Sequence, residues 1–82
     1  MNKADNIRDF VFRKHIEQDR KQGERVVTIR AGDVHKDMGL YDRMPAVCSA
    51  LGSKKFENQF NIKRLKVEGP IQDANALFIF EI

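Results

Sequence analysis

The sequence predicts a single small α+β domain in which a long helix and a strand precede two further helices and a pair of strands. Apolar residues recur three and four positions apart over residues 6–22, which is the helical period, whereas residues 25–30 and 76–82 are rich in β-branched and aromatic side chains. The chain has 82 residues, of which 41% are hydrophobic, and this suits one domain with one core. We therefore expect residues 1–82 to form a single domain.

The first helix is expected over residues 6–22. Ile7 and Val11 lie in its apolar stripe, Asn6 is a favourable N-cap, and Gly23 is a favourable C-terminal stop. The β-branched run that follows is short and is typical of a strand.

Two short helical segments are expected next. Gly32 interrupts the strand pattern, and residues 33–38 fit one and a half helical turns. The second helix is expected over residues 43–53, beginning either with Asp42 as N-cap or with Pro45 at the first helical position.

The C-terminal part is expected to hold a further helical turn or two at Phe56 and Phe60, followed by two strands. These strands cover residues 61–67 and 76–82. Turn-forming residues fill positions 68–75 between them, so the pair should form a hairpin with a long loop.

Residues 34–47 resemble a helix-turn-helix motif. Val34 and Met38 lie one helical turn apart, Gly39 can adopt the left-handed conformation that the turn needs, and Leu40 can fill the space between the helices. The second helix carries an apolar stripe at the required spacing: Met44, Val47, Cys48 and Leu51. One departure is His35, where the family pattern favours a small residue.

Together with the first helix, the strand and the hairpin, this motif gives an arrangement over residues 6–82 that resembles a winged helix-turn-helix domain. The resemblance implies that residues 43–53 form the recognition helix, which lies in the major groove of DNA. The face opposite its apolar stripe is expected to be small and polar: Asp42, Ala46, Ser49, Ala50 and Ser53, flanked by Arg43 and Lys54. Small side chains permit close approach to a groove, and they equally suit packing between helices.

The net charge of +3 is concentrated in one part of the chain. Residues 43–68 contain six bases and two acids, and the bases are Arg43, Lys54, Lys55, Lys63, Arg64 and Lys66. Strand alternation predicts that Arg64 and Lys66 share an exposed face while Lys63 shares the other with Leu65. Such a cluster indicates either an anionic partner or ordinary solubilising charge.

These observations predict a non-catalytic protein that binds double-stranded DNA, as a small transcriptional regulator or as the DNA-reading part of a larger system. The expected contacts to grooves and phosphates come from one set of residues: Arg43, Ala46, Ser49, Ser53, Lys54, Lys55, Arg64 and Lys66. The alternative is a winged-helix domain that binds another protein and no DNA.

Other classes of function find little support in the sequence. The lone Cys48 is expected to be a buried thiol, and His15 and His35 lack the neighbouring Cys or His that a metal site needs, so we expect no metal and no cofactor. No catalytic arrangement is present, and an enzyme is not expected. No apolar run reaches membrane-spanning length and no signal peptide is recognisable, which predicts a cytoplasmic protein.

Two surfaces are candidates for a homodimer interface; the alternative for the last strand is that the rest of the chain covers both of its faces. On the first helix, Phe12 and Ile16 are expected to point away from the apolar stripe. The last strand is apolar on both faces, with Phe78, Phe80 and Ile82 on one side and Leu77 and Ile79 on the other.

Overall fold

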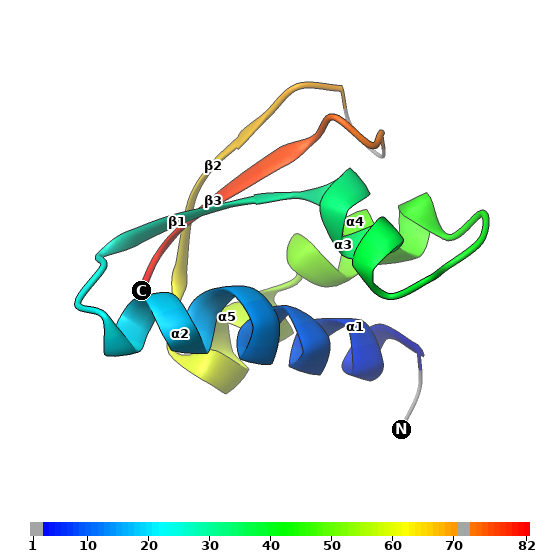
Figure 1. Cartoon of the computed structure of the whole chain (residues 1–82). Helices are drawn as coiled ribbons and strands as arrows, with labels where there is room; N and C mark the ends of the chain where they lie inside the picture. Colours follow the sequence, from blue (N-terminus) through cyan, green and yellow to red (C-terminus); the bar gives the residue numbers. More distant parts are fainter. Residues whose placement is uncertain (1–2, 71–72) are drawn as a thin grey trace.

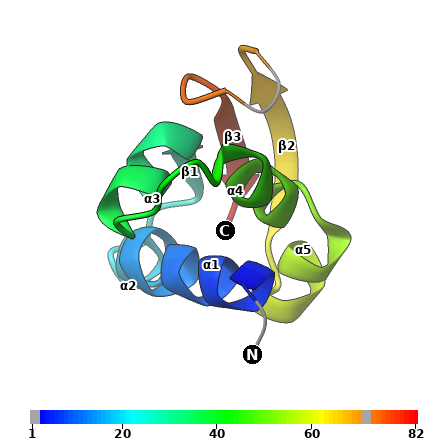
Figure 2. The ribbon, with the colours of Figure 1, turned by 90° about the vertical axis from the view of Figure 1, so that its right-hand side faces the viewer.

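The computed structural model describes residues 3–70 and 73–82, and it shows an α+β fold (Figure 1). The elements are α1 (Lys3–Val11), the π-helix η1 (Phe12–Ile16), α2 (Glu17–Lys21), β1 (Val26–Arg30), α3 (Ala31–Asp37), α4 (Met44–Leu51), α5 (Lys54–Phe60), β2 (Lys63–Glu68) and β3 (Leu77–Glu81). The strands form an antiparallel sheet in the order β1-β3-β2. The helices pack on one side of this sheet, as the two views in Figures 1 and 2 show. The predicted α+β class is confirmed, and the elements follow the predicted order except that α5 is a separate third helix between β1 and the hairpin.

The sheet has one buried and one open face. Val27 and Ile29 of β1 and Phe78 and Phe80 of β3 point into the core, because directly paired residues of antiparallel strands share a face. On the other face Val26 is 49% exposed. Burying one face against helices is how a small sheet obtains a hydrophobic core.

The first helix is a continuous helical segment from α1 to α2. The π-helical turn in its middle changes which residues face the core, relative to the prediction. In a regular α-helix Val11 and Ile16, five residues apart, would point about 140° away from each other. The π-helix, with its i→i+5 bonding, brings Ile16 back to the face of Ile7 and Val11, and all three are fully buried. The prediction that Phe12 and Ile16 point away from the core is therefore wrong. Phe12 stacks on Phe60 at 4.3 Å between ring centroids.

The ends of this first segment and of α3 correct two details of the prediction. Asn6 lies inside α1 and is not its N-cap, because the helix begins at Lys3. Gly23 has φ +85°, as expected of a residue that stops a helix. The strand ends at Arg30, before Gly32 as predicted, but α3 begins at Ala31 and not at residue 33, so Gly32 lies within it. A Cβ at Gly32 would lie 2.7 Å from the carbonyl oxygen of Ala74, so this glycine permits close contact between α3 and the hairpin loop.

The turn between α3 and α4 follows the prediction. Gly39 adopts φ +66°. The start of α4 matches neither predicted alternative: Arg43 is its N-cap and Met44 its first residue, so Pro45 is the second helical residue, and Asp42 precedes the cap with φ +54°. His35 is half-buried, and its Nε2 accepts a hydrogen bond of 3.0 Å from the backbone N–H of Arg43. Through this hydrogen bond His35 links α3 to Arg43, the N-cap of α4.

The hairpin also appears at the predicted place. Its two strands begin and end within two residues of the expected positions, and residues 71–72 of the predicted 68–75 loop lie outside the described part of the chain. No helix in residues 3–70 and 73–82 is long and apolar enough to cross a membrane.

Candidate nucleic-acid interface

The helix expected to read DNA, α4, has a narrower exposed face than the sequence predicted. The predicted apolar stripe is confirmed: Val47, Cys48 and Leu51 are buried, and Met44 is half-buried. Ala50 was expected on the exposed face, but it is only 1% exposed, so that expectation is wrong. The reason is that α4 packs against both α1 and α3, which encloses more of its circumference. Ser49 is exposed and Ala46 half-buried.

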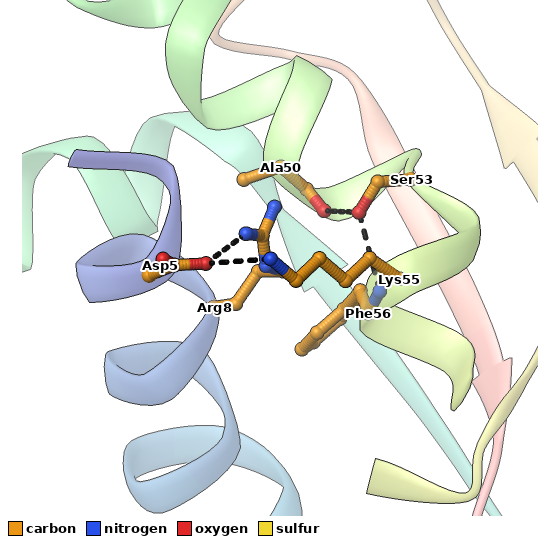
Figure 3. A network of polar contacts seen from close by, with 6 residues as sticks. All are labelled: Asp5, Arg8, Ala50, Ser53, Lys55 and Phe56. Atoms are coloured by element: carbon orange, nitrogen blue, oxygen red, sulfur yellow. Dashed lines mark hydrogen bonds and ion pairs between the residues drawn. The ribbon is translucent and has the colours of Figure 1, made fainter. Parts of the chain in front are cut away.

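Ser53 forms the junction between α4 and α5. Its Oγ donates a hydrogen bond of 2.8 Å to the carbonyl oxygen of Ala50 and accepts one of 3.2 Å from the backbone N–H of Phe56 (Figure 3). The same hydroxyl thus ends one helix and caps the next. A groove contact from this half-buried side chain would compete with both bonds.

Lys54 and Lys55, the first residues of α5, are both exposed. Lys55 Nζ lies 3.5 Å from Asp5 Oδ1, and Asp5 also accepts a hydrogen bond from the buried Arg8 (Figure 3). The Arg8 hydrogen bond is the main cause that lowers the pKa of Asp5, and the positive charge of Lys55 lowers it further. Lys55 therefore connects α5 to α1 and is partly neutralised within the protein, unlike its neighbour.

Arg64, the second residue of β2, reaches back to the junction of the helices. Its Nη1 donates a hydrogen bond to the carbonyl oxygen of Gly52, and its backbone N–H donates one of 2.6 Å to Glu57 Oε1. A guanidinium at the C-terminal end of a helix satisfies a carbonyl that has no partner inside the helix. This contact holds a cation of the strand at Gly52, two residues before Lys54 in the chain, and Arg64 stays exposed.

Lys66 is exposed as predicted, but it does not share a face with Arg64. The register of β2 against β3 shifts between them, with Arg64 opposite Phe80 and Lys66 opposite Ile79. A β-bulge adds one residue to a strand and so reverses the alternation beyond it. Lys66 consequently lies on the open face of the sheet with Lys63, and its Nζ is 3.0 Å from Glu68 Oε1.

Arg43 lies at the opposite end of α4 from Lys54. Its side chain is exposed, and its Nη1 is 3.5 Å from the carbonyl oxygen of Asp42. Since the eight residues of α4 span about 12 Å, the two cations are separated by about the length of this helix, one beyond each end. In Figure 2, α4 lies between the β2–β3 hairpin above it and α5 at its lower right.

A groove of about 360 Å³ runs between α4 and the hairpin. It is lined by Cys48, Ser49, Gly52, Arg64, Val67, Ala76 and Phe78. The groove therefore includes two of the predicted contact residues, Ser49 of α4 and Arg64 of β2.

Sequence reasoning missed the ion-pair network of Asp5, Arg8 and Lys55. The spacing of Asp5 and Arg8 at i, i+3 was a signal for a pair on one helix face, but the link to Lys55 depends on how α1 and α5 pack. It also missed Tyr41, which is 89% exposed in the loop before α4.

No family model matches the chain, and neither the curated proteins nor the solved structures compared with it give a match. The candidate interface is thus characterised by its own geometry and charge.

Proposed function

We propose that this protein is a small non-catalytic DNA-binding module, in which α4 approaches the major groove and the cations around it contact phosphates. The observation that carries the proposal is the hydrogen bond from Arg64 to Gly52, because it joins the strand cation to the end of α4 beside Lys54. A transcriptional regulator and the DNA-reading part of a larger system are the two settings that this activity suits.

The arrangement of the elements supports the proposal. A helix, a strand, two helices across a glycine turn and a hairpin follow one another, and the sheet order β1-β3-β2 sets the hairpin beside α4. This is the order expected of a winged helix-turn-helix domain, in which the hairpin is the wing and α4 the recognition helix. The additional helix α5, between α4 and the wing, carries the lysines.

The ion pairs within the protein determine how many phosphates it would contact. Lys55 and Lys66 are partly neutralised by Asp5 and Glu68, which leaves Arg43, Lys54 and Arg64 as the main contacts. Three phosphate contacts predict a slope of about −3 for the logarithm of the binding constant against the logarithm of the salt concentration.

This salt dependence can be measured by titrating a fluorescently labelled duplex of random sequence with the protein at several salt concentrations. We expect Arg43→Glu with Lys54→Glu to reduce the slope by about two and to weaken binding at least tenfold. Lys55 is left unchanged in this variant because its loss would disturb the contact with Asp5.

The matched control is Lys14→Glu with Lys36→Glu, which changes the net charge equally at two exposed lysines of η1 and α3. In Figure 2, α3 lies on the other side of α4 from α5 and β2. Equal loss of affinity in the two double variants, or no binding by the folded wild type at low salt, would refute the proposal.

A second candidate is a protein-interaction domain, favoured by the open face of the sheet. Val26 is 49% exposed there, and Leu77 and Ile79 of β3 are half-buried beside it. A homodimer through this face would make Val26→Lys monomeric in sedimentation experiments, while DNA binding measured on the same variant separates the two candidates.

A further inference from the structure

The groove between α4 and the hairpin has walls of different chemistry. Ser49 and Gly52 of α4 form one side, and Val67 and Phe78 of the hairpin form an apolar surface opposite them. The volume of about 360 Å³ lies at the lower end of the range for small-molecule sites, so a ligand with one ring or a short branched chain would fit.

Two local features of the backbone keep this groove open and charged. Arg64 and Val67 are three positions apart, and in a regular strand they would lie on opposite faces. The bulge between Arg64 and Lys66 brings both to the side of α4, with Val67 opposite the buried Phe78. At Gly52 a Cβ would lie 3.4 Å from Arg64 Nη1 and 3.8 Å from Phe78 Cε2, so any larger residue would fill the space between the two walls.

The charge of the groove favours an anion. Among the described residues that line it, Arg64 is the one with a formal charge, and no carboxylate is present. One of its guanidinium nitrogens, Nη1, donates to Gly52, and no hydrogen bond from Nε or Nη2 to another described residue is formed. A guanidinium has five donors, and its second edge can bind both oxygens of a carboxylate.

We propose that this groove binds a small aromatic monocarboxylate, with its ring against Val67 and Phe78 and its carboxylate on Arg64. If the proposed function is correct, such a ligand competes with a DNA phosphate for the same guanidinium and lowers DNA affinity. The groove and its ligand can be tested without DNA, so failure of either proposal is recognised separately.

Benzoate is the probe, and amide chemical shifts of the ¹⁵N-labelled full chain are the measurement. We expect saturable shifts in the amides of Ser49, Gly52, Arg64 and Val67. Benzamide has the same ring without the charge and acetate has the charge without the ring, so each should bind at least tenfold more weakly. Equal shifts with all three compounds, shifts centred elsewhere, or no saturation by benzoate would overturn the proposal.

Two pairs of variants locate the site without removing core residues. Val67→Phe should fill the groove and weaken benzoate binding at least tenfold, whereas Leu65→Phe should not, although the two side chains are 41% and 46% exposed on the same strand. Arg64→Gln should weaken benzoate binding to the level of benzamide, whereas Lys66→Gln should leave it unchanged. An effect of both members of either pair would refute the assignment to this groove.

The link to DNA is tested last, by measuring wild-type affinity for the labelled duplex with benzoate and with acetate at equal ionic strength. We expect benzoate alone to weaken binding, and the difference should disappear in Val67→Phe. If the wild type binds DNA equally well in benzoate and in acetate, the ligand does not compete with DNA for Arg64.

Discussion

The two helices beside the hairpin, α4 and α5, are held in different ways. Half of the eight residues of α4 are buried, and the helix is enclosed by α1 and α3. In α5 only Phe56 is buried among seven residues, while Lys54, Lys55, Asn58 and Gln59 are exposed. The helix that would approach DNA, α4, is thus firmly packed but has few exposed side chains. Its neighbour α5 has several exposed polar side chains but only one buried apolar residue.

This difference suggests separate roles for the two helices in the proposed interface. A helix with small exposed residues can come close to a groove, but contacts of high energy must come from longer side chains around it. Those side chains belong to the ends of α4, to α5 and to β2. The attachment of α5 therefore matters for the interface as much as the packing of α4 does.

The largest expected effect concerns the aromatic anchor of α5. Phe56 is fully buried, with edge-to-face contacts to Phe60 at 5.6 Å and Phe80 at 5.4 Å between ring centroids. Phe56→Ala should lower the free energy of unfolding by about 3–5 kcal/mol, because it removes a large side chain from a packed core. Urea denaturation measures this. Phe60→Ala is the control, and since Phe60 is half-buried its cost should be clearly smaller; the reverse order would contradict the assignment of Phe56 as the anchor.

A smaller effect is expected at the junction of the two helices. Ser53→Ala removes the N-cap of α5 and a partner of the Ala50 carbonyl, and should lower the free energy of unfolding by about 1 kcal/mol. Ser53→Asp keeps an acceptor for the Phe56 N–H and should recover most of that loss. Ser49→Ala on the exposed face of α4 should stay within about 0.5 kcal/mol. If Ser49→Ala costs as much as Ser53→Ala, Ser53 does not act as a cap.

Much of the fold could be predicted because it depends on local patterns. The glycine turn at Gly39 and the helix that contains Phe56 and Phe60 follow from residue spacing and turn chemistry. Two departures have a common cause, since each adds one residue to a regular element. The π-helical turn puts Ile16 into the core, and the bulge in β2 separates Lys66 from Arg64. Tertiary packing favours extra residues of this kind. The periodic pattern of the sequence carries no information about that packing, so it could not predict them.

The candidate interface was predictable in composition but only partly in geometry. The basic cluster and the exposure of Lys54 follow from the sequence. The contact of Arg64 with Gly52 joins residues twelve positions apart, and that of Lys55 with Asp5 joins residues fifty apart, so both depend on how finished elements meet. These long-range contacts decide which cations would remain for phosphates in the proposed complex with DNA.

The smallest expected effect is the pH dependence of the link between α1 and α5. The hydrogen bond from Arg8 lowers the pKa of Asp5 below its ordinary value of 3.8. A carboxyl whose pKa is lower in the folded than in the unfolded state stabilises the fold above its ordinary pKa, and this contribution is lost as pH falls through the lowered value. Asp5→Asn should therefore make the free energy of unfolding fall less steeply below pH 3.8 than in the wild type.

The control for this dependence of the free energy of unfolding on pH is Asp9→Asn. It removes an acid of the same helix whose partner is the exposed Arg13, 3.2 Å away. Urea denaturation from neutral pH down to about one unit below the ordinary pKa of an aspartate measures all three proteins. Because Lys55 also contacts Asp5, Lys55→Gln should reduce the wild-type slope by a smaller amount than Asp5→Asn, in keeping with its more exposed position. An acid slope that is the same in the wild type and Asp5→Asn would show that the charge of Asp5 does not hold the two helices together, and that α5 is held by its uncharged contacts such as those of Phe56, Phe60 and Ser53.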